Sequence, residues 1–325
     1  MTDTPKILTI RDRVLGGGKV THAEGVELLG LEGATVSDLM AAATHVRERF
    51  KGNRVHLCAI VNAKSGNCPE DCAFCAQSLH SRAQSPKFPM LSAGEIVEAA
   101  KRAQTAGARC FGIVTSGRSL NPRDLEIVCD AVRRIRRELH ILPDASLGVL
   151  TEEMAQALKD AGLNGYHHNV ETARSYYPRV CTTHTWEENL ATLRLARKYG
   201  FRVCSGGVLG LGETIEQRIE MAEELSGVDL DRVCLNFFIA VKGTRLEDAP
   251  PMKPTEILKT ISVYRLFFPT KDINICAGRE LHLRDLQGMI FLAGASATMV
   301  GNYLTQAGRP AEQDLQLLRD LELEW

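Results

Sequence analysis

The sequence predicts an α/β fold, a (β/α)8 barrel of the TIM type, from two observations. Helical segments alternate with short, apolar, β-rich runs along most of the 325 residues, and such alternation is typical of a parallel sheet with its helices outside. The β-runs number eight, the count at which this kind of sheet closes. We expect a single domain over residues 1–325, because α/β barrels often exceed the usual domain length.

Two regions lie outside the predicted barrel. Residues 1 to about 50 are expected to form a helical extension, in which Thr35 and Ser37 are candidate N-caps of the second predicted helix. The tail over residues 308–325 is expected to add a helix to the outside. The first elements predicted are helices over 21–29 and 35–50 and a strand over 55–61.

Seven more strands follow, each preceded by a helix. The predicted strands are 109–115, 141–147, 165–171, 201–206, 232–239, 273–277 and 295–299. The predicted helices are 93–105, 122–137, 152–161, 186–199, 216–226, 254–268 and 284–292. Gly162 and Gly200 each stand between a helix and its strand, where glycine commonly ends a helix.

The composition narrows the class of protein. The chain is 44% hydrophobic and 24% charged, with a net charge of −1, so no strongly basic field points to nucleic acid or a membrane surface. No apolar stretch approaches the length of a membrane span, and the first residues lack the apolar core of a signal peptide. The ten cysteines therefore suggest metal chemistry in a reducing compartment, and we expect a cytoplasmic protein.

Three cysteines follow the first predicted strand. Cys68, Cys72 and Cys75 have the spacing C-x3-C-x2-C, with no fourth cysteine nearby. A [4Fe–4S] cluster usually has four thiolate ligands, so three would leave one iron free for a small molecule. Zinc is an alternative, but a structural zinc site needs four ligands, and His80 is the nearest histidine. A disulfide is the other alternative.

A second group of polar residues ends the fourth predicted strand. Asn169 and Glu171 share a face with His167, because side chains alternate along a strand. A carboxylate inside a barrel needs a partner, which a ribose diol or an ammonium group would provide; a purely structural polar network is the alternative. Further on, Gly210 and Gly212 permit close approach of backbone to a ligand, although two glycines alone are weak evidence.

These motifs together carry a resemblance. The three-cysteine loop, with Phe74 before its last cysteine, is similar to the signature of the radical S-adenosylmethionine superfamily. Over residues 20 to 320, further motifs resemble the biotin synthase family. They are Cys-Pro-Glu-Asp-Cys-x-x-Cys-x-Gln-Ser (68–78), His-His-Asn-x-Glu-Thr (167–172), Cys-Ser-Gly-Gly-x-x-Gly-Leu-Gly-Glu-Thr (204–214), Lys-Gly-Thr-x-Leu (242–246), Ala-Gly-Arg-Glu (277–280) and Gly-Asn-Tyr-Leu-Thr (301–305).

The resemblance implies a reaction and its cofactors. A [4Fe–4S] cluster held by the three cysteines would reduce S-adenosylmethionine to methionine and a 5′-deoxyadenosyl radical. That radical would abstract hydrogen from dethiobiotin at C9 and then at C6, and an auxiliary iron–sulfur cluster would supply the sulfur that makes biotin. The resemblance also implies a low-potential electron donor of the flavodoxin or ferredoxin type, and a homodimer.

The same resemblance suggests roles for single residues. Asn169 would contact both dethiobiotin and S-adenosylmethionine, Glu171 the ribose of the cofactor, and Asn236 the substrate. Gly210 and Gly212 would lie against the cofactor. Cys204 would hold the auxiliary cluster and, with Asn169, take part in catalysis.

The sequence departs from the best-known family pattern at the auxiliary cluster. Of the three cysteines and one arginine in that pattern only Cys204 is matched, and the other positions carry Gly112, Asp144 and Asn274. Cys110 lies two residues before Gly112, on the same face but not at the same position. Cysteines expected to compensate are Cys58, Cys181, Cys234 and Cys276.

The nature of the auxiliary cluster stays open at this point. The run Val180 to His184, together with His168, resembles a subgroup of the family found in anaerobes and expected to hold a different cluster. Either a [2Fe–2S] cluster or a variant of the [4Fe–4S] type is therefore expected. Cys129, on a predicted helix, is interpreted as a buried small hydrophobic residue.

Two other functions compete with this interpretation. The first is a related radical enzyme on the same barrel, such as a hydrogenase-cofactor maturase or a mutase, which would not need a sacrificial sulfur donor. The second is a non-catalytic iron–sulfur carrier, which would need no pocket for S-adenosylmethionine. Iron and sulfide per chain separate the first alternative from the family reaction, and cleavage of S-adenosylmethionine separates the second.

Overall fold

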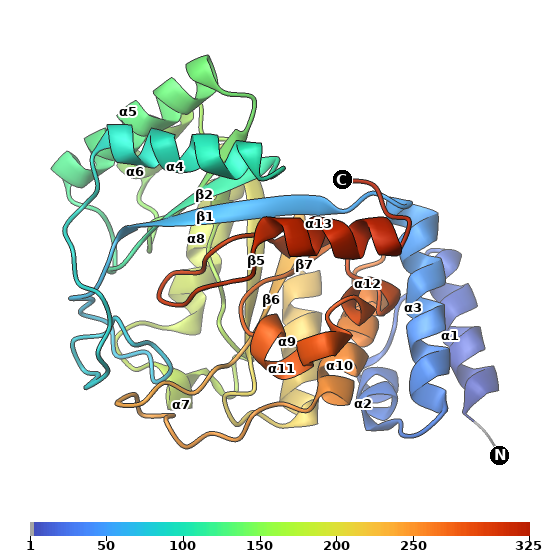
Figure 1. The fold of residues 1–325 in the computed structure, drawn as a ribbon. Coiled ribbons are helices and arrows are strands. Elements are labelled where there is room, and N and C mark those ends of the chain that lie inside the picture. Colours follow the sequence, from blue (N-terminus) through green and yellow to red (C-terminus); the bar gives the residue numbers. More distant parts are fainter. Residues whose placement is uncertain (1–2) are drawn as a thin grey trace.

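The computed structural model of the chain describes residues 3–325 and contains a closed barrel of eight parallel strands (Figure 1). Each strand pairs with the next, and the ring closes where β1 pairs with β8. The strands are β1 (His56–Lys64), β2 (Cys110–Thr115), β3 (Leu142–Ser146), β4 (Gly165–His167), β5 (Arg202–Leu209), β6 (Arg232–Phe237), β7 (Asp272–Ile275) and β8 (Ala297–Met299). The predicted fold class is confirmed.

Helices connect the strands along the outside of the barrel. They are α4 (Ala93–Thr105), α5 (Pro122–Glu138), α6 (Glu152–Ala161), α7 (Tyr177–Val180), α8 (Trp186–Lys198), α9 (Ile215–Ser226) and α10 (Pro254–Phe267). Local sequence fixes where several begin: Ser92 and Glu95 form a capping box at α4, and Thr185 and Glu188 form one at α8. Each box satisfies backbone N–H groups that have no partner inside the helix.

Three N-terminal helices lie away from the mouth of the barrel, where the second and third pack against α10 and the first packs against the third (Figure 1). They are α1 (Thr4–Leu15), α2 (His22–Gly30) and α3 (Thr35–Lys51). Their contact is apolar: Ile7, Leu39 and Leu266 are among its buried side chains. The first two residues of the expected extension lie outside the described residues.

The prediction of N-caps at Thr35 and Ser37 is wrong. Ala34 occupies the N-cap of α3, and no side chain caps this end. Thr35 is already inside the helix, and its hydroxyl donates to the Glu32 carbonyl at 2.7 Å. A capping side chain must instead come from the non-helical residue that precedes the helix.

Two predicted elements are shorter than expected. The regular part of the fourth strand ends at His167. Contact with β5 continues beyond it, because Val170 donates to the Gly206 carbonyl at 3.0 Å and Glu171, at a positive φ of 67°, forms an isolated bridge with Gly207. The helix predicted over 284–292 is divided, with Arg284 at a φ of 51°. The predicted range contains the 3-10 turn η1 (Arg284–Leu286) and the short helix α12 (Met289–Leu292), and a separate helix, α11 (Arg279–Leu283), precedes it.

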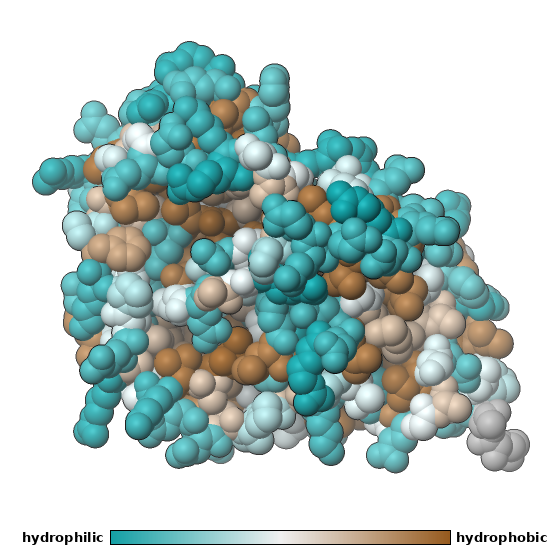
Figure 2. Space-filling model, viewed as in Figure 1, coloured by the Kyte–Doolittle hydropathy of each residue, from teal (hydrophilic) through white to brown (hydrophobic). Residues whose placement is uncertain are grey.

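The C-terminal tail forms α13 (Ala311–Asp320) on the outside of the barrel, as predicted (Figure 1). A buried ion pair fixes it, because Arg279 donates to Asp314 at 2.7 Å. On the face shown in Figure 2, hydrophilic residues cover much of α4, α5 and α13. Within residues 3–325, every helix falls short of the length and apolar character needed to cross a bilayer.

One buried arginine connects α10 to the base of the barrel. Arg265 is fully buried and donates to the backbone carbonyls of Gly294, Phe268 and Lys271, each at 2.8 Å. Burial lowers the pKa of its guanidinium to about 9. These carbonyls would have no donor if the guanidinium were removed.

We therefore expect Arg265→Met to reduce the free energy of unfolding by about 3 kcal/mol, the scale of a hydrogen bond to a charged group in a buried place. Urea unfolding of the anaerobically purified protein measures this. Arg137→Met is the control, because Arg137 is exposed and pairs with its neighbour Glu138, so its effect should stay within about 0.5 kcal/mol. Equal effects of the two substitutions would contradict the assigned role of Arg265.

Candidate active site

The cysteine loop lies between β1 and α4, at the carboxyl ends of the strands, where the active sites of such barrels are built. Backbone bonds close the loop on itself: Cys68 donates to the Gln77 carbonyl at 3.1 Å, and Leu79 donates to the Cys68 carbonyl at 2.8 Å. Cys68, Cys72 and Cys75 are all partly buried and line one cavity. Burial raises the pKa of Cys75 to about 11, so without a metal this thiol stays protonated.

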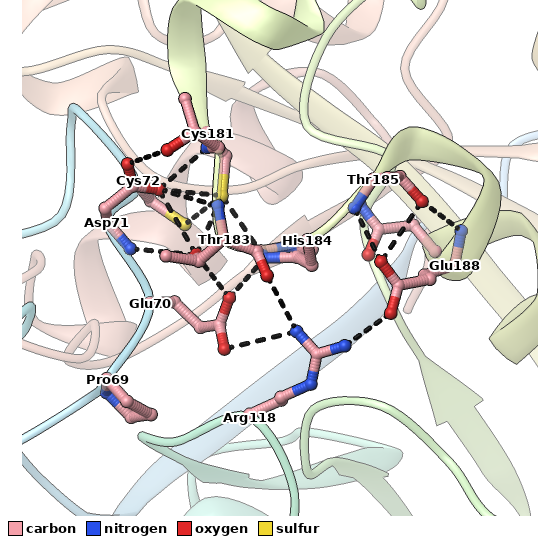
Figure 3. Close-up of polar contacts among 12 residues, drawn as sticks. Pro69, Glu70, Asp71, Cys72, Arg118, Cys181, Thr183, His184, Thr185 and Glu188 are labelled. Atoms are coloured by element: carbon pink, nitrogen blue, oxygen red, sulfur yellow. Dashed lines mark hydrogen bonds and ion pairs between the residues drawn. The ribbon is translucent and has the colours of Figure 1, made fainter.

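A polar network fixes the cysteine loop to the segment after α7 (Figure 3). Glu70 accepts hydrogen bonds from Thr183, at 2.6 Å, and from His184. Arg118, from the loop after β2, donates to Glu70 at 3.4 Å and also pairs with Glu188. The loop conformation is thus fixed by charges from two other parts of the chain.

Cys181 belongs to this network. Its sulfur lies 3.9 Å from that of Cys72 and 3.2 Å from Nδ1 of His184. Burial opposes a charge on His184, but Cys181 and Glu70 raise its pKa to about 9. Cys72, Cys181 and His184 also form a group with ligand atoms within 4.8 Å of one another, one short of the four ligands of a structural zinc site.

Asn169 and Glu171 lie close together, consistent with the expected shared face. The side-chain amide of Asn169 donates to Glu171 at 3.2 Å, and both residues line the cavity. Burial raises the pKa of Glu171 to about 7. Glu171 also has the unfavourable φ of 67°, and strained backbone of this kind is concentrated at functional sites.

The cavity measures about 460 Å³ and runs from the cysteine loop into the barrel. That volume is within the range of small-molecule sites. Asn236 of β6 also lines it, held by hydrogen bonds to the backbone of Gly207 and Ala277, each at 3.2 Å.

Five buried cysteines from five strands or their ends gather deep in this cavity, and we call them the thiol chamber. They are Cys58, Cys110, Cys204, Cys234 and Cys276. Cys58 and Cys110 are register partners on β1 and β2, with sulfur atoms 2.8 Å apart. On β5 and β6, Cys204 faces Arg232 and Gly206 faces Cys234, so the chamber spans the barrel.

Two polar side chains point into the thiol chamber. Arg232 donates to the sulfur of Cys58 at 2.8 Å and to that of Cys110 at 3.3 Å. On the opposite pair, the amide of Asn274 donates to Cys276 at 3.2 Å and to Cys234 at 3.7 Å. Each thiol pair therefore has its own hydrogen-bond donor.

The predicted auxiliary ligands do not all meet. Cys58, Cys204, Cys234 and Cys276 lie in the thiol chamber, whereas Cys181 lies beside Cys72, outside it. Asp144 and Asn274, at two positions of the family pattern, also line the cavity. Cys129 is buried on α5 and packs in the main core, which fits its interpretation as a small hydrophobic residue.

Gly210 and Gly212 are not among the residues that line the cavity. Both have positive φ, 90° and 108°, and Glu213 accepts from the backbone of Gly210 and Leu211 at 2.8 Å. A Cβ at Gly212 would lie 2.6 Å from the Tyr176 hydroxyl. A tight turn thus accounts for both glycines, and their contact with a cofactor stays a prediction.

Sequence reasoning left two parts of the site unassigned. Strand alternation puts Cys110 on the same face as Gly112 but indicates no role for it, and Arg232, the first residue of its strand, belongs to no recognisable motif. The Glu70–His184 pair also passed unnoticed because 114 residues separate its members. Such contacts between distant strands and loops follow from the closed ring.

The chemistry of the donor set fits iron–sulfur clusters at two places. At the mouth, three cysteines share one loop and one cavity. In the thiol chamber, five buried cysteines lie in one cluster, and two of their sulfur atoms contact Arg232. The Nε of Arg232 and Oδ1 of Asn274 are buried without a hydrogen-bond partner. Thiolates are the usual ligands of such clusters, and unpartnered polar atoms this deeply buried indicate a missing partner.

Comparisons with known families agree with this geometry. Residues 63–225 match the radical SAM superfamily, and residues 234–324 match the biotin and thiamin synthesis associated domain. Among solved structures, methylornithine synthase superposes with a TM-score of 0.85 at 24% identity, covering 97% of this chain and 96% of that one. An FeFe-hydrogenase maturase from Carboxydothermus hydrogenoformans gives 0.81 at 17% identity, covering 98% and 79%. At these identities the two structures establish the fold alone.

Curated relatives are much more similar. The biotin synthase of Geotalea uraniireducens is 50% identical over 324 residues, covering 99% of this chain and 98% of that protein. The biotin synthase of Geobacter sulfurreducens is 51% identical over 316 residues, covering 97% and 96%. By this similarity along nearly its whole length, the chain belongs to the biotin synthase family of the radical SAM superfamily.

Proposed function

We propose that the chain is a radical S-adenosylmethionine enzyme that converts dethiobiotin to biotin. The observation that carries the proposal is the presence of two separate cysteine sets along one cavity. When bound, a [4Fe–4S] cluster with S-adenosylmethionine supplies the 5′-deoxyadenosyl radical, and an auxiliary iron–sulfur cluster supplies the sulfur. A related radical enzyme without a sulfur donor would have no use for the thiol chamber, and a carrier would have no use for a cavity of this size.

The strand register supports an order of layers along the barrel. Asn236 lies two residues beyond Cys234 on β6, and Asn169 lies two residues beyond His167, the partner of Cys204. Two residues advance a strand by about 6.6 Å and return to the same face. On β6, Asn236 therefore lies nearer the cysteine loop than Cys234, and Asn169 lies nearer the loop than the position that pairs with Cys204. We assign them to the substrate, between the two clusters.

Residue roles follow from this order. Cys68, Cys72 and Cys75 would hold the [4Fe–4S] cluster, and Glu171, held by Asn169, would accept hydrogen bonds from the ribose of S-adenosylmethionine. The thiol chamber would hold the auxiliary cluster through Cys204 and its neighbours. Cys110 replaces Cys181 in this set, because Cys181 lies beside Cys72. Five sulfur atoms exceed the usual four ligands, so a variant of the [4Fe–4S] type is as compatible with the chamber as [2Fe–2S].

The surface around the cysteine loop suits electron entry. The three cysteines are only partly buried, and Leu79, just beyond the loop, is 59% exposed. We propose that a low-potential donor of the flavodoxin or ferredoxin type reduces the cluster here. We also propose that the protein is a cytoplasmic homodimer. We further propose that it forms a single domain, because both matched family regions contribute strands to one barrel.

Substituting Cys68, Cys72 or Cys75 by Ala is expected to remove the first cluster and abolish reductive cleavage of S-adenosylmethionine. The reason is that three thiolates are the minimum for an open-iron cluster. Iron content and 5′-deoxyadenosine, measured anaerobically, test this. Cys129→Ala is the matched control. Cys181→Ala should retain the iron, whereas a zinc site made by Cys72, Cys181 and His184 would lose its metal in that variant.

Glu171→Ala is expected to weaken binding of S-adenosylmethionine by about 1.5–3 kcal/mol, the scale of a charge-assisted hydrogen bond, and to leave iron content unchanged. Because burial raises the pKa of Glu171 to about 7, its charged form grows as pH rises. Wild-type affinity should therefore be higher at pH 8 than at pH 6, and Glu171→Gln should flatten this dependence. Equilibrium binding at both pH values decides; an unchanged dissociation constant in Glu171→Ala would make the residue structural.

Cys204→Ser is expected to spare the first cluster and the cleavage of S-adenosylmethionine, yet to stop biotin formation. Cys110→Ser should behave in the same way, and Cys181→Ser should not, because only the first two lie in the thiol chamber. Iron, 5′-deoxyadenosine and biotin are measured on one anaerobic sample. Wild-type amounts of biotin from Cys204→Ser would mean that the sulfur comes from elsewhere.

A further inference from the structure

Arg232 is a buried cation whose environment differs from that of the other deeply buried arginines. It is 4% exposed, and within residues 3–325 no carboxylate oxygen lies within 4.0 Å of its guanidinium nitrogens. Arg279, by contrast, pairs with Asp314 at 2.7 Å, and Arg265 donates to backbone carbonyls. Burying a charge without a partner in contact is costly. Asp144 and Asp272 act on Arg232 only at longer range, so its guanidinium has room for an anionic partner at hydrogen-bond distance.

Within the described residues, the guanidinium of Arg232 donates hydrogen bonds only to sulfur atoms of the thiol chamber. Its Nη1 atom donates to Cys58 at 2.8 Å and to Cys110 at 3.3 Å, and its Nε is buried without a partner. Arg232 lowers the pKa of the buried Asp144 carboxyl, but burial outweighs this and raises that pKa, and Asp144 already accepts from Asn164 at 2.7 Å. The guanidinium is therefore free to bind sulfur.

We propose that Arg232 is a positioning residue for the auxiliary cluster. Its guanidinium donates hydrogen bonds to the sulfur atoms of Cys58 and Cys110, and its charge offsets the negative charge of the thiolates and of the group they hold. Hydrogen bonds to sulfur and local net charge set the reduction potential of iron–sulfur clusters. Arg232 thus retains the cluster and makes its potential less negative. This inference rests on the proposed function, namely on a second cluster in the thiol chamber.

The geometry distinguishes this role from a structural one. A structural arginine would be satisfied by fixed backbone acceptors, as Arg265 is by the carbonyls of Gly294, Phe268 and Lys271. Arg232 is instead the first residue of β6 and pairs in register with Cys204 of β5. Its side chain extends across the barrel interior to the cysteines of β1 and β2. Its hydrogen bonds are therefore made to the predicted ligands themselves.

The test isolates the auxiliary cluster. The full-length parent carries Cys68→Ala, Cys72→Ala and Cys75→Ala, so that any iron retained after anaerobic reconstitution is in the thiol chamber. Arg232→Met removes both charge and donors, and Arg232→Lys keeps the charge but loses the planar fork of donors. Arg202→Met is the matched control, since Arg202 of β5 has no hydrogen bond to a cysteine among the described residues. The readouts are iron and sulfide per chain, the rate of iron loss to a chelator, and the midpoint potential.

We expect Arg232→Met to lose iron about tenfold to a hundredfold faster than the parent, the equivalent of one charge-assisted hydrogen bond, and to shift the midpoint potential to a more negative value. Arg232→Lys should lie between the two, and Arg202→Met should match the parent. A folded Arg232→Met or Arg232→Lys protein with the parent's loss rate and potential would overturn the proposal. A parent without iron would instead overturn the auxiliary site of the proposed function, so the two failures are distinguishable.

Discussion

Closure of the eight-stranded ring is the constraint on which the site depends. In a closed parallel barrel, inward side chains from different strands must share layers. β1 is paired with β2 on one edge and with β8 on the other. This ring brings Cys58 of β1 and Cys234 of β6 into one apolar cluster, although the two residues are 176 positions apart in the sequence. An open sheet would hold the same cysteines in a row with no common centre.

The barrel also decides how charge is tolerated inside it. Arg279 forms an ion pair with Asp314, and the charge of Arg265 is stabilised by hydrogen bonds to backbone carbonyls. Arg232 meets sulfur instead. The three arginines thus offset the cost of removing a cation from water in different ways. Arg279 and Arg265 connect the outer tail and α10 to the barrel. Arg232 places a positive charge beside the thiol chamber, where sulfur chemistry is proposed.

Two kinds of thiol environment result from the arrangement. Strand β1 ends at Lys64, six residues after Cys58, and six residues of strand span about 20 Å. The cysteine loop begins beyond this end. Its thiols are partly exposed and held by a charged network that includes Glu70 and Arg118. The chamber thiols are buried. This separation fits the proposed electron entry near the surface and the proposed sulfur transfer deeper in the same cavity.

The sequence by itself determined the barrel, the bounds of helices such as α4 and α6, and the three-cysteine loop, because these depend on local periodicity, capping and spacing. It also indicated that Asn169 and Glu171 lie together, since alternation along a short segment is a local property. Only the tertiary structure decided which distant cysteines meet. Cys181 lies beside Cys72, outside the thiol chamber, whereas Cys110 lies in the chamber and Arg232 donates into it. The physical reason is that strand order and register, which set contacts across the barrel, are properties of the closed ring and are not encoded within any one segment.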